Sequence, residues 1–344
     1  MTASIELALD EDTAVISPIG ASLRGYTAAG RPVVVPMGAF DGAVLAPWPN
    51  RIADGRYRFA GEDRRLPITE PERGTALHGL VAGVEWEIAE RTATSARLDT
   101  MLAETEGYPH TLALSVRYEL TAGGLAVRAA ARNLGTGPAP FGFGFHPWFH
   151  PGGDRVDDAA LLVPAGAWYA TDERLIPTEV RPFDDGSLIP ADHVRDDSAC
   201  IVCKDFRALR AIDGTVLDDA FGSPSRSADD RARLGGDERS RAEADREPTG
   251  DEDRPGAGDE AGALGSWSYA RLRGADDHEI VIGMNESFRA WQACTGDGLD
   301  PDHARRAIAI EPMTCAPNAF GVGEGYDVIA PGAEFAVEWS IALA

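Results

Sequence analysis

The hydrophobic pattern of this chain is that of short β-strands. Apolar and polar residues alternate over segments such as Arg56–Phe59, Thr111–Leu120 and Leu125–Asn133, so successive side chains point to opposite faces of a strand. Clusters of Gly, Pro and Asp separate these segments, and the turn Thr121–Gly124 is typical of a hairpin. Long helical periodicity is absent. The pattern predicts an all-β chain that forms a large antiparallel β-sandwich or a barrel.

One long segment interrupts this pattern. Residues 225–265 are rich in Asp, Glu, Arg, Gly and Ala and contain almost no large apolar side chains. Such a segment cannot bury enough apolar surface to offset the entropy that it would lose on ordering. We expect a disordered or irregular acidic insertion, with a short charged helix over Asp229–Asp245 as the alternative. Residues 1–344 are otherwise expected to form a single domain.

The stretch Phe141–His150 carries the first candidate chemistry. Read as a strand, it places Phe141, Phe143 and Phe145 on one face, and two glycines followed by His146 on the other. Glycine inside a strand often marks a close approach to the backbone, so His146 is expected at the floor of a cleared trough. The alternative is a buried, hydrogen-bonded histidine in a core strand.

Two further strand ends repeat this arrangement, in which small residues lead to one titratable group. In Thr75–Gly79 the titratable group is His78, and in Ala307–Thr314 it is Glu311. Each motif alone has a structural explanation. Together with His146, the three strand ends predict a cavity lined by two histidines and one carboxylate.

Four further polar residues suit the hydroxyl groups of a sugar. Asn50 and Arg51 follow a Trp flanked by two prolines and offer an amide and a guanidinium group. Asp218 adds a carboxylate, and Gln292 adds an amide next to Trp291. Aromatic faces, a guanidinium, an amide and carboxylates together favour a carbohydrate ligand. The structural alternatives are an arginine paired with a nearby acid and an aspartate in a turn.

Composition excludes two classes of partner. The formal charge of −24, with Lys204 as the single lysine, argues against a nucleic-acid or anionic-membrane surface. No apolar run is long enough to cross a membrane, and the N-terminus lacks the pattern of a signal peptide. We therefore expect a cytoplasmic monomer or homodimer with free thiols. Cys200 and Cys203 have a CxxC spacing, but without a second pair they predict no metal site.

In this order the motifs resemble those of the aldose 1-epimerase (galactose mutarotase) family. The residues that carry the resemblance are Asn50-Arg51-Ile52, Ala76-Leu77-His78-Gly79, Gly144-Phe145-His146-Pro147, Leu217-Asp218-Asp219-Ala220-Phe221, Gln292 before Thr295-Gly296, and Glu311-Pro312 with Pro317-Asn318-Ala319-Phe320. The resemblance extends from about Ile19 to the C-terminus, outside the acidic insertion. It implies a galactose mutarotase-like super-sandwich and an isomerase that interconverts the α and β anomers of an aldose without metal or other cofactor.

The resemblance also implies a role for each candidate residue. Anomer exchange needs a base for the C1 hydroxyl proton and an acid for the ring oxygen, so that the ring opens and closes again on the other face. By resemblance, Glu311 is the base and His146 is the acid, an ionised carboxylate near a protonated imidazole. His78 would hold the ring oxygen or the C1 hydroxyl. The other hydroxyls of the sugar would be bound by Arg51, Asp218, Gln292 and Asn50.

One position departs from the family pattern. Many relatives have a histidine after the motif aspartate, whereas this chain has Asp219, and the acidic insertion begins shortly afterwards. The departure leaves open whether Asp218 or Asp219 faces the site.

The sugar and the class of function also stay open. Ala46–Arg51 and Glu311–Phe320 are most similar to a bacterial branch that includes sulfoquinovose mutarotases, while a neutral hexose is the other candidate substrate. A sulfonate would need a cationic partner, for which the candidates are Arg24, Arg51 and Arg73. The same fold is compatible with a non-catalytic sugar-binding protein. A glycoside hydrolase would need two carboxylates at one bond, such as Glu311 and Asp218.

Overall fold

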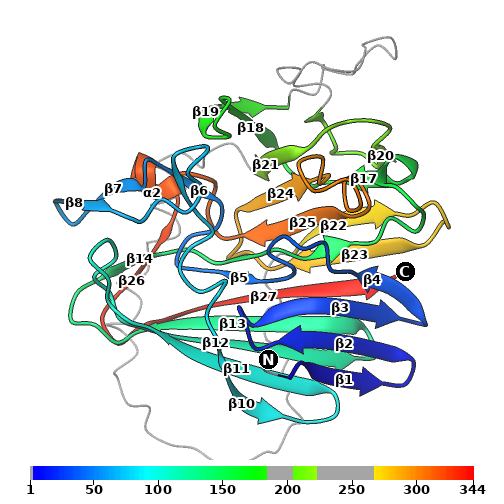
Figure 1. The fold of residues 1–344 in the computed structure, drawn as a ribbon, viewed down its shortest axis with the longest axis horizontal. Helices are drawn as coiled ribbons and strands as arrows, with labels where there is room; N and C mark the ends of the chain where they lie inside the picture. The colour runs from blue at the N-terminus through cyan, green and yellow to red at the C-terminus, as the bar shows by residue number, and fades with distance from the viewer. Residues whose placement is uncertain (1–2, 184–203, 223–266) are drawn as a thin grey trace, which may run out of the picture.

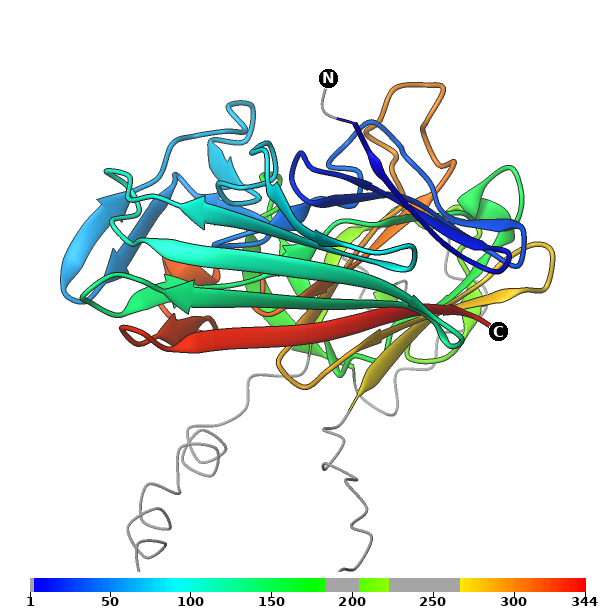
Figure 2. The same ribbon diagram turned by 90° about the horizontal axis from the view of Figure 1, so that it is seen from below.

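Two large antiparallel sheets, packed face to face, form the body of the molecule (Figures 1 and 2). The computed structural model describes residues 3–183, 204–222 and 267–344. The larger sheet has 12 strands, and its main path is β1-β2-β3-β4-β16-β25-β24-β21-β18-β19, with β15 paired to β25 and to β5. In that order the strands are β1 (Ile5–Leu9), β2 (Asp12–Ser17), β3 (Ser22–Ala28), β4 (Arg31–Val34), β16 (Trp148–Phe149), β25 (Ile308–Met313), β24 (Ala290–Cys294), β21 (Asp218–Gly222), β18 (Ala167–Thr171), β19 (Pro177–Pro182), β15 (Gly144–Phe145) and β5 (Val44–Leu45).

The second sheet has nine strands, and three short ribbons and two short helices complete the described structure. The order of the second sheet is β10 (Glu87–Arg91), β11 (Ser95–Leu102), β12 (Leu112–Thr121), β13 (Gly124–Asn133), β27 (Glu334–Leu343), β23 (Glu279–Met284), β22 (Ser268–Arg273), β17 (Ala160–Leu162) and β20 (Arg210–Ala211). The ribbons pair β14 (Ala139–Phe141) with β26 (Asp327–Ile329), β6 (Arg51–Ala53) with β9 (Thr75–Leu77), and β7 (Arg56–Phe59) with β8 (Glu62–Arg65). The helices are the 3-10 turn η1 (Val156–Asp158) and α2 (Ala319–Val322). The predicted all-β sandwich is confirmed.

The core lies between the two sheets and is rich in aromatic side chains. Burial alternates residue by residue along β12 and β13, as the sequence pattern predicts. Their register pairs Thr121 with Gly124 across the predicted hairpin turn. From the larger sheet, Phe145 packs on Trp339 of β27 with ring centroids 5.2 Å apart. Aromatic pairs of this kind bury large apolar areas and fix how the sheets pack.

The segment Phe141–His150 is not one strand but falls in β14, β15 and β16. Phe141, Phe143 and Phe145 are fully buried, as expected. The predicted close approach to the glycine face also exists, but the chain itself makes it. A Cβ added at Gly144 would lie 2.5 Å from Cβ of Pro49. The expected open trough is therefore filled by the loop that leads to Asn50, which ties that loop to the sheet.

Several predictions concern residues outside the described part of the chain. These are the acidic insertion at 225–265, its alternative helix over Asp229–Asp245, and the pair Cys200 and Cys203. Within the described ranges, the cysteines Cys294 and Cys315 are free. No helix there has the length and apolar character needed to span a bilayer.

Candidate active site

Three predicted residues lie on β21, β24 and β25, which are neighbours in the larger sheet (Figure 1). Gln292 of β24 lies directly opposite Glu311 of β25 on one side and Ala220 of β21 on the other. Asp218 lies two residues before Ala220 on β21 and therefore on the same face. Because Ile310 packs in the core between the sheets, Glu311 points to the opposite face, away from the nine-stranded sheet.

The three residues predicted to be catalytic are adjacent. Nε2 of His146 lies 3.4 Å from Oε1 of Glu311, and the rings of His146 and His78 meet edge to face with centroids 5.3 Å apart. All three side chains are buried, Glu311 with only 1% of its surface exposed. Nδ1 of His146 and Oε2 of Glu311 have no hydrogen-bond partner among the described residues. The pair thus contains two buried polar atoms that the described residues leave without a hydrogen bond.

Burial sets the protonation of this pair. It raises the pKa of Glu311 well above the ordinary value, and the nearby charge of Asp218 adds to the shift. Burial also lowers the pKa of His146 to about 4, although the charge of Asp41 opposes this. The resemblance implies an ionised carboxylate near a protonated imidazole, whereas burial in this structure favours the neutral form of each group. Both descriptions place one proton on the pair and differ only in which residue holds it.

Two hydrogen bonds with the backbone of Asn50 hold His78 in place. The backbone N–H of His78 donates to the carbonyl of Asn50 at 2.9 Å, and the N–H of Asn50 donates to Nδ1 of His78 at 3.2 Å. Both residues have left-handed backbones, with φ of 57° and 55°. Burial lowers the pKa of His78 well below the ordinary value, and the charges of His146 and Arg51 add to this. The ring is therefore neutral and carries its proton on Nε2, as a hydrogen-bond donor.

Arg51 and Asp218 form the polar border of this cluster. Nε and Nη2 of Arg51 donate to the two carboxylate oxygens of Glu70 at 2.9 and 3.0 Å. Nη2 of Arg51 also lies 3.7 Å from Oδ2 of Asp218, and the amide of Gln292 donates to Oδ1 of Asp218 at 2.7 Å. The Asp218 side chain is 35% exposed, so it faces both solvent and the cluster. Asp219 is instead buried on the other face of β21, which answers the question left open by the sequence.

Comparison with known proteins identifies the family. A family model described as aldose 1-epimerase matches residues 4–225. An Escherichia coli K12 protein described as uncharacterized protein YihR is 41% identical over 328 residues, which cover 93% of this chain and 86% of that protein. The chain belongs to the aldose 1-epimerase family.

Other members of the aldose 1-epimerase family agree with this assignment. Galactose mutarotase from mouse is 32% identical over 148 residues, or 41% of this chain and 42% of that enzyme. A solved structure described as the GalM/aldose epimerase homologue from C. elegans superposes with a TM-score of 0.74 at 18% identity and covers 100% of this chain and 99% of that chain. The structural likeness shows the shared fold. The family, its sandwich fold and the isomerase class expected from the sequence are confirmed.

One aromatic side chain at the candidate site was missed by the sequence analysis. The ring of Phe40 lies 4.5 Å from His78 and 5.7 Å from His146, measured between centroids, and yet Phe40 is 41% exposed. Its φ of 50° lies in the left-handed region, which a bulky residue rarely adopts. Asp41 holds the loop by accepting hydrogen bonds from the backbone N–H groups of Met37 and Gly38 at 2.6 and 2.9 Å. Phe40 therefore covers both histidines.

Glu70 was also missed, because no motif marks it. It is buried, and besides the paired Arg51 it accepts a hydrogen bond from the hydroxyl of Thr75 at 2.6 Å. These hydrogen bonds lower its pKa against the opposing effect of burial. Glu70 thus stays ionised and fixes the orientation of the Arg51 guanidinium. Glu70 lies 19 positions after Arg51, so local sequence gives no signal for the pair.

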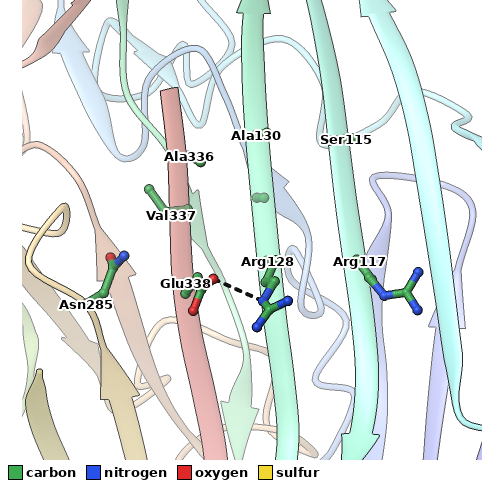
Figure 3. Close-up of a pocket in the computed structure, with 9 residues that line it drawn as sticks. Ser115, Arg117, Arg128, Ala130, Asn285, Ala336, Val337 and Glu338 are labelled. Carbon is green, nitrogen blue, oxygen red and sulfur yellow. Dashed lines mark ion pairs between the residues drawn. The ribbon is translucent and has the colours of Figure 1, made fainter. Parts of the chain in front are cut away.

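A hollow of about 260 Å³ lies elsewhere, on the exposed face of the nine-stranded sheet (Figure 3). Its charged lining residues are Arg117, Arg128 and Glu338, and the last two pair at 3.0 Å. Among its nine lining residues there is no histidine, and Glu338 is the only carboxylate. In the part of the chain that the structure describes, no group of His, Cys, Asp or Glu is arranged to hold a metal ion. The histidine–glutamate cluster remains the candidate site.

Proposed function

We propose that this chain exchanges the anomers of a hexose, with Glu311 as general base and His146 as general acid. The observation that carries the proposal is the buried pair, with 3.4 Å between Nε2 of His146 and Oε1 of Glu311. Glu311 removes the proton from the C1 hydroxyl while His146 protonates the ring oxygen, and the bond between C1 and the ring oxygen breaks. The aldehyde then rotates about the C1–C2 bond. The reverse steps close the ring on the other face.

The reaction starts from the form in which Glu311 is ionised and His146 is protonated. The buried pair reaches this form by moving its one proton from Glu311 to His146. A C1 hydroxyl that donates a hydrogen bond to Glu311 stabilises the carboxylate, and a ring oxygen that accepts from His146 stabilises the imidazolium. Sugar binding thus supplies the hydrogen bonds that favour the reactive form.

The neighbouring residues bind and orient the sugar. His78 is neutral and donates through Nε2 to the ring oxygen or the C1 hydroxyl. Arg51, Asp218 and Gln292 bind the remaining hydroxyls from one side of the cluster. Asn50, which the sequence analysis treats as a sugar ligand, is assigned a positioning role here, because its backbone holds His78 on both sides.

A second candidate substrate is a sulfonated sugar such as sulfoquinovose. Each of the three arginines expected to bind a sulfonate lies near a carboxylate: Arg24 near Asp41 at 3.2 Å, and both Arg51 and Arg73 near Glu70 at 2.9 and 3.2 Å. Arg51 and Arg73 share Glu70, and Arg51 also lies 3.7 Å from Asp218, so these four groups are balanced in charge when Asp218 is ionised. An anionic substituent of the sugar would therefore compete with a carboxylate for one of these arginines.

Anomer exchange followed by NMR tests the proposal. The purified protein is mixed in turn with glucose, galactose and sulfoquinovose, and exchange between the two anomeric signals is compared with the spontaneous rate. We expect exchange with at least one sugar, its loss in His146→Ala, and its retention in the matched control His278→Ala, whose histidine is exposed and pairs with Asp276. Binding of a sugar without exchange would overturn the proposal and favour a sugar-binding protein.

A further inference from the structure

The only lysine of the chain is buried behind the candidate site. Lys204 is 7% exposed, although lysine is among the residues that are least often buried. Its Nζ donates to Oδ2 of Asp219 at 2.6 Å and to the carbonyl of Val216 at 2.7 Å. Every other strong base in the chain is an arginine. The ammonium of lysine is compact and makes these two short hydrogen bonds, whereas an arginine would place a larger, planar guanidinium there.

Asp219, the partner of Lys204, is bonded on both oxygens. The indole N–H of Trp168 donates to Oδ1 at 2.8 Å, and the backbone N–H of Asp218 donates to Oδ2 at 3.2 Å. Asp218 and Asp219 are consecutive in β21, so their side chains point to opposite faces of the strand. The buried ion pair is therefore bonded directly to the backbone of the residue whose side chain borders the site.

The charge of Asp219 also acts on Asp218. Burial raises the pKa of Asp218, and Asp219 adds to the shift while Arg51 opposes it. The ammonium of Lys204 lies against Asp219 and balances its charge. Without Lys204, an unpaired carboxylate would remain buried next to Asp218, and both the position and the ionisation of Asp218 would change.

We propose that Lys204 is a positioning residue for sugar binding: through Asp219 and Trp168 it holds β21 so that Asp218 accepts a hydrogen bond from a sugar hydroxyl. The proposal rests on the proposed function, because it assumes that Asp218 binds the sugar. It assigns a role to Lys204, which belongs to none of the sequence motifs, and to Asp219, which departs from the family pattern.

The test is a double-mutant cycle on the ion pair, measured with a sugar that the wild type exchanges. Lys204→Met should raise KM about tenfold and change kcat less than about threefold, since Asp218 touches bound sugar but no reacting atom. The double variant Lys204→Met with Asp219→Asn should recover part of the loss in KM, because the amide needs no counter-charge, although its single oxygen cannot accept from both Trp168 and the backbone N–H of Asp218. The control Arg128→Met removes an exposed positive charge on the other sheet and should leave KM unchanged.

Two kinetic outcomes would overturn the positioning role. One is a wild-type KM in Lys204→Met. The other is an unchanged KM together with a kcat that falls only as the folded fraction falls, with no rescue by the double variant. That outcome is expected if the ion pair serves only the stability of the fold. If Lys204→Met does not fold, the wild type still provides a test, because selective isotope labelling of lysine gives signals from Lys204 alone.

The lysine signal also separates this proposal from the proposed function. Saturating sugar should shift the Nζ signal of Lys204 in the wild type but not in Asp218→Asn. A signal that does not move when the sugar is bound would overturn the positioning role. The failure of the proposed function has a different signature, in which the lysine signal shifts with sugar but the wild type exchanges no anomers.

Discussion

Replacing Glu311 by glutamine should move activity and stability in opposite directions. Glutamine has nearly the same size and shape but cannot accept the C1 proton. Loss of a general base typically slows a reaction by about 10²–10⁴-fold, which corresponds to about 3–5 kcal/mol in the activation free energy. We therefore expect Glu311→Gln to bind sugar while anomer exchange falls by this factor.

The stability effect follows from the pKa of Glu311. Because burial raises this pKa above the value of 4.5 for an exposed glutamate, the folded protein holds the proton at a pH where the unfolded chain has lost it. The free energy of unfolding therefore falls as pH rises above the unfolded pKa. Over the pH range between the unfolded and folded pKa values, this loss of stability grows by about 1.4 kcal/mol per pH unit. Glutamine removes this loss, so the variant should be more stable than wild type at pH 7 and similar near pH 4.

The assay combines anomer exchange by NMR with denaturant unfolding at pH 7 and pH 4. The matched control is Glu338→Gln, an exposed carboxylate on β27 that pairs with Arg128 (Figure 3). We expect it to leave exchange unchanged and to alter stability by less than about 0.5 kcal/mol. A Glu311→Gln protein with wild-type exchange would refute the assignment of the base. A variant that is less stable at pH 7 would show that Glu311 is ionised in the fold and paired with protonated His146.

Two more predictions concern the same proton. The pH profile of kcat/KM should be bell-shaped. Below about pH 4 His146 takes up a second proton, and above the raised pKa of Glu311 the pair loses its only proton. A rate that stays constant from pH 3 to pH 10 would contradict this. Phe40→Ala should expose both histidine rings to water, so the midpoint of the acid side of the pH profile should move from about 4 toward the ordinary histidine pKa of 6.5. A midpoint that does not move would show that Phe40 does not exclude water from His146.

The sequence predicts well which faces of the strands carry the candidate residues. Alternation alone places Glu311 on the opposite face from Ile310, and the structure has the same arrangement. The phenylalanines of Phe141–Phe145 are buried as predicted, even though the segment is divided between two short strands. A side-chain period of two depends only on local backbone geometry, so it can be read without knowledge of the fold.

The electrostatic part of the site could not be predicted in the same way. The pair of Arg51 with Glu70 and the pair of Lys204 with Asp219 join residues 19 and 15 positions apart, through loops that no motif specifies. The direction of the pKa shift of His146 depends on how completely the fold buries it. Net charge and spacing contain no information on that burial, and so an ionised pair was the natural expectation from the sequence.

The site therefore has two parts that differ in what fixes them. Glu311, Gln292 and Asp218 lie on neighbouring strands, where the hydrogen bonds of the sheet set their spacing and leave little freedom. His78 and Phe40 lie on loops with left-handed backbones, which persist only where surrounding contacts hold them. Because proton transfer requires close and constant geometry, the strands are a suitable place for the proposed base. In the proposed site the loops carry His78 and Phe40, so changes of substrate can arise there without moving Glu311.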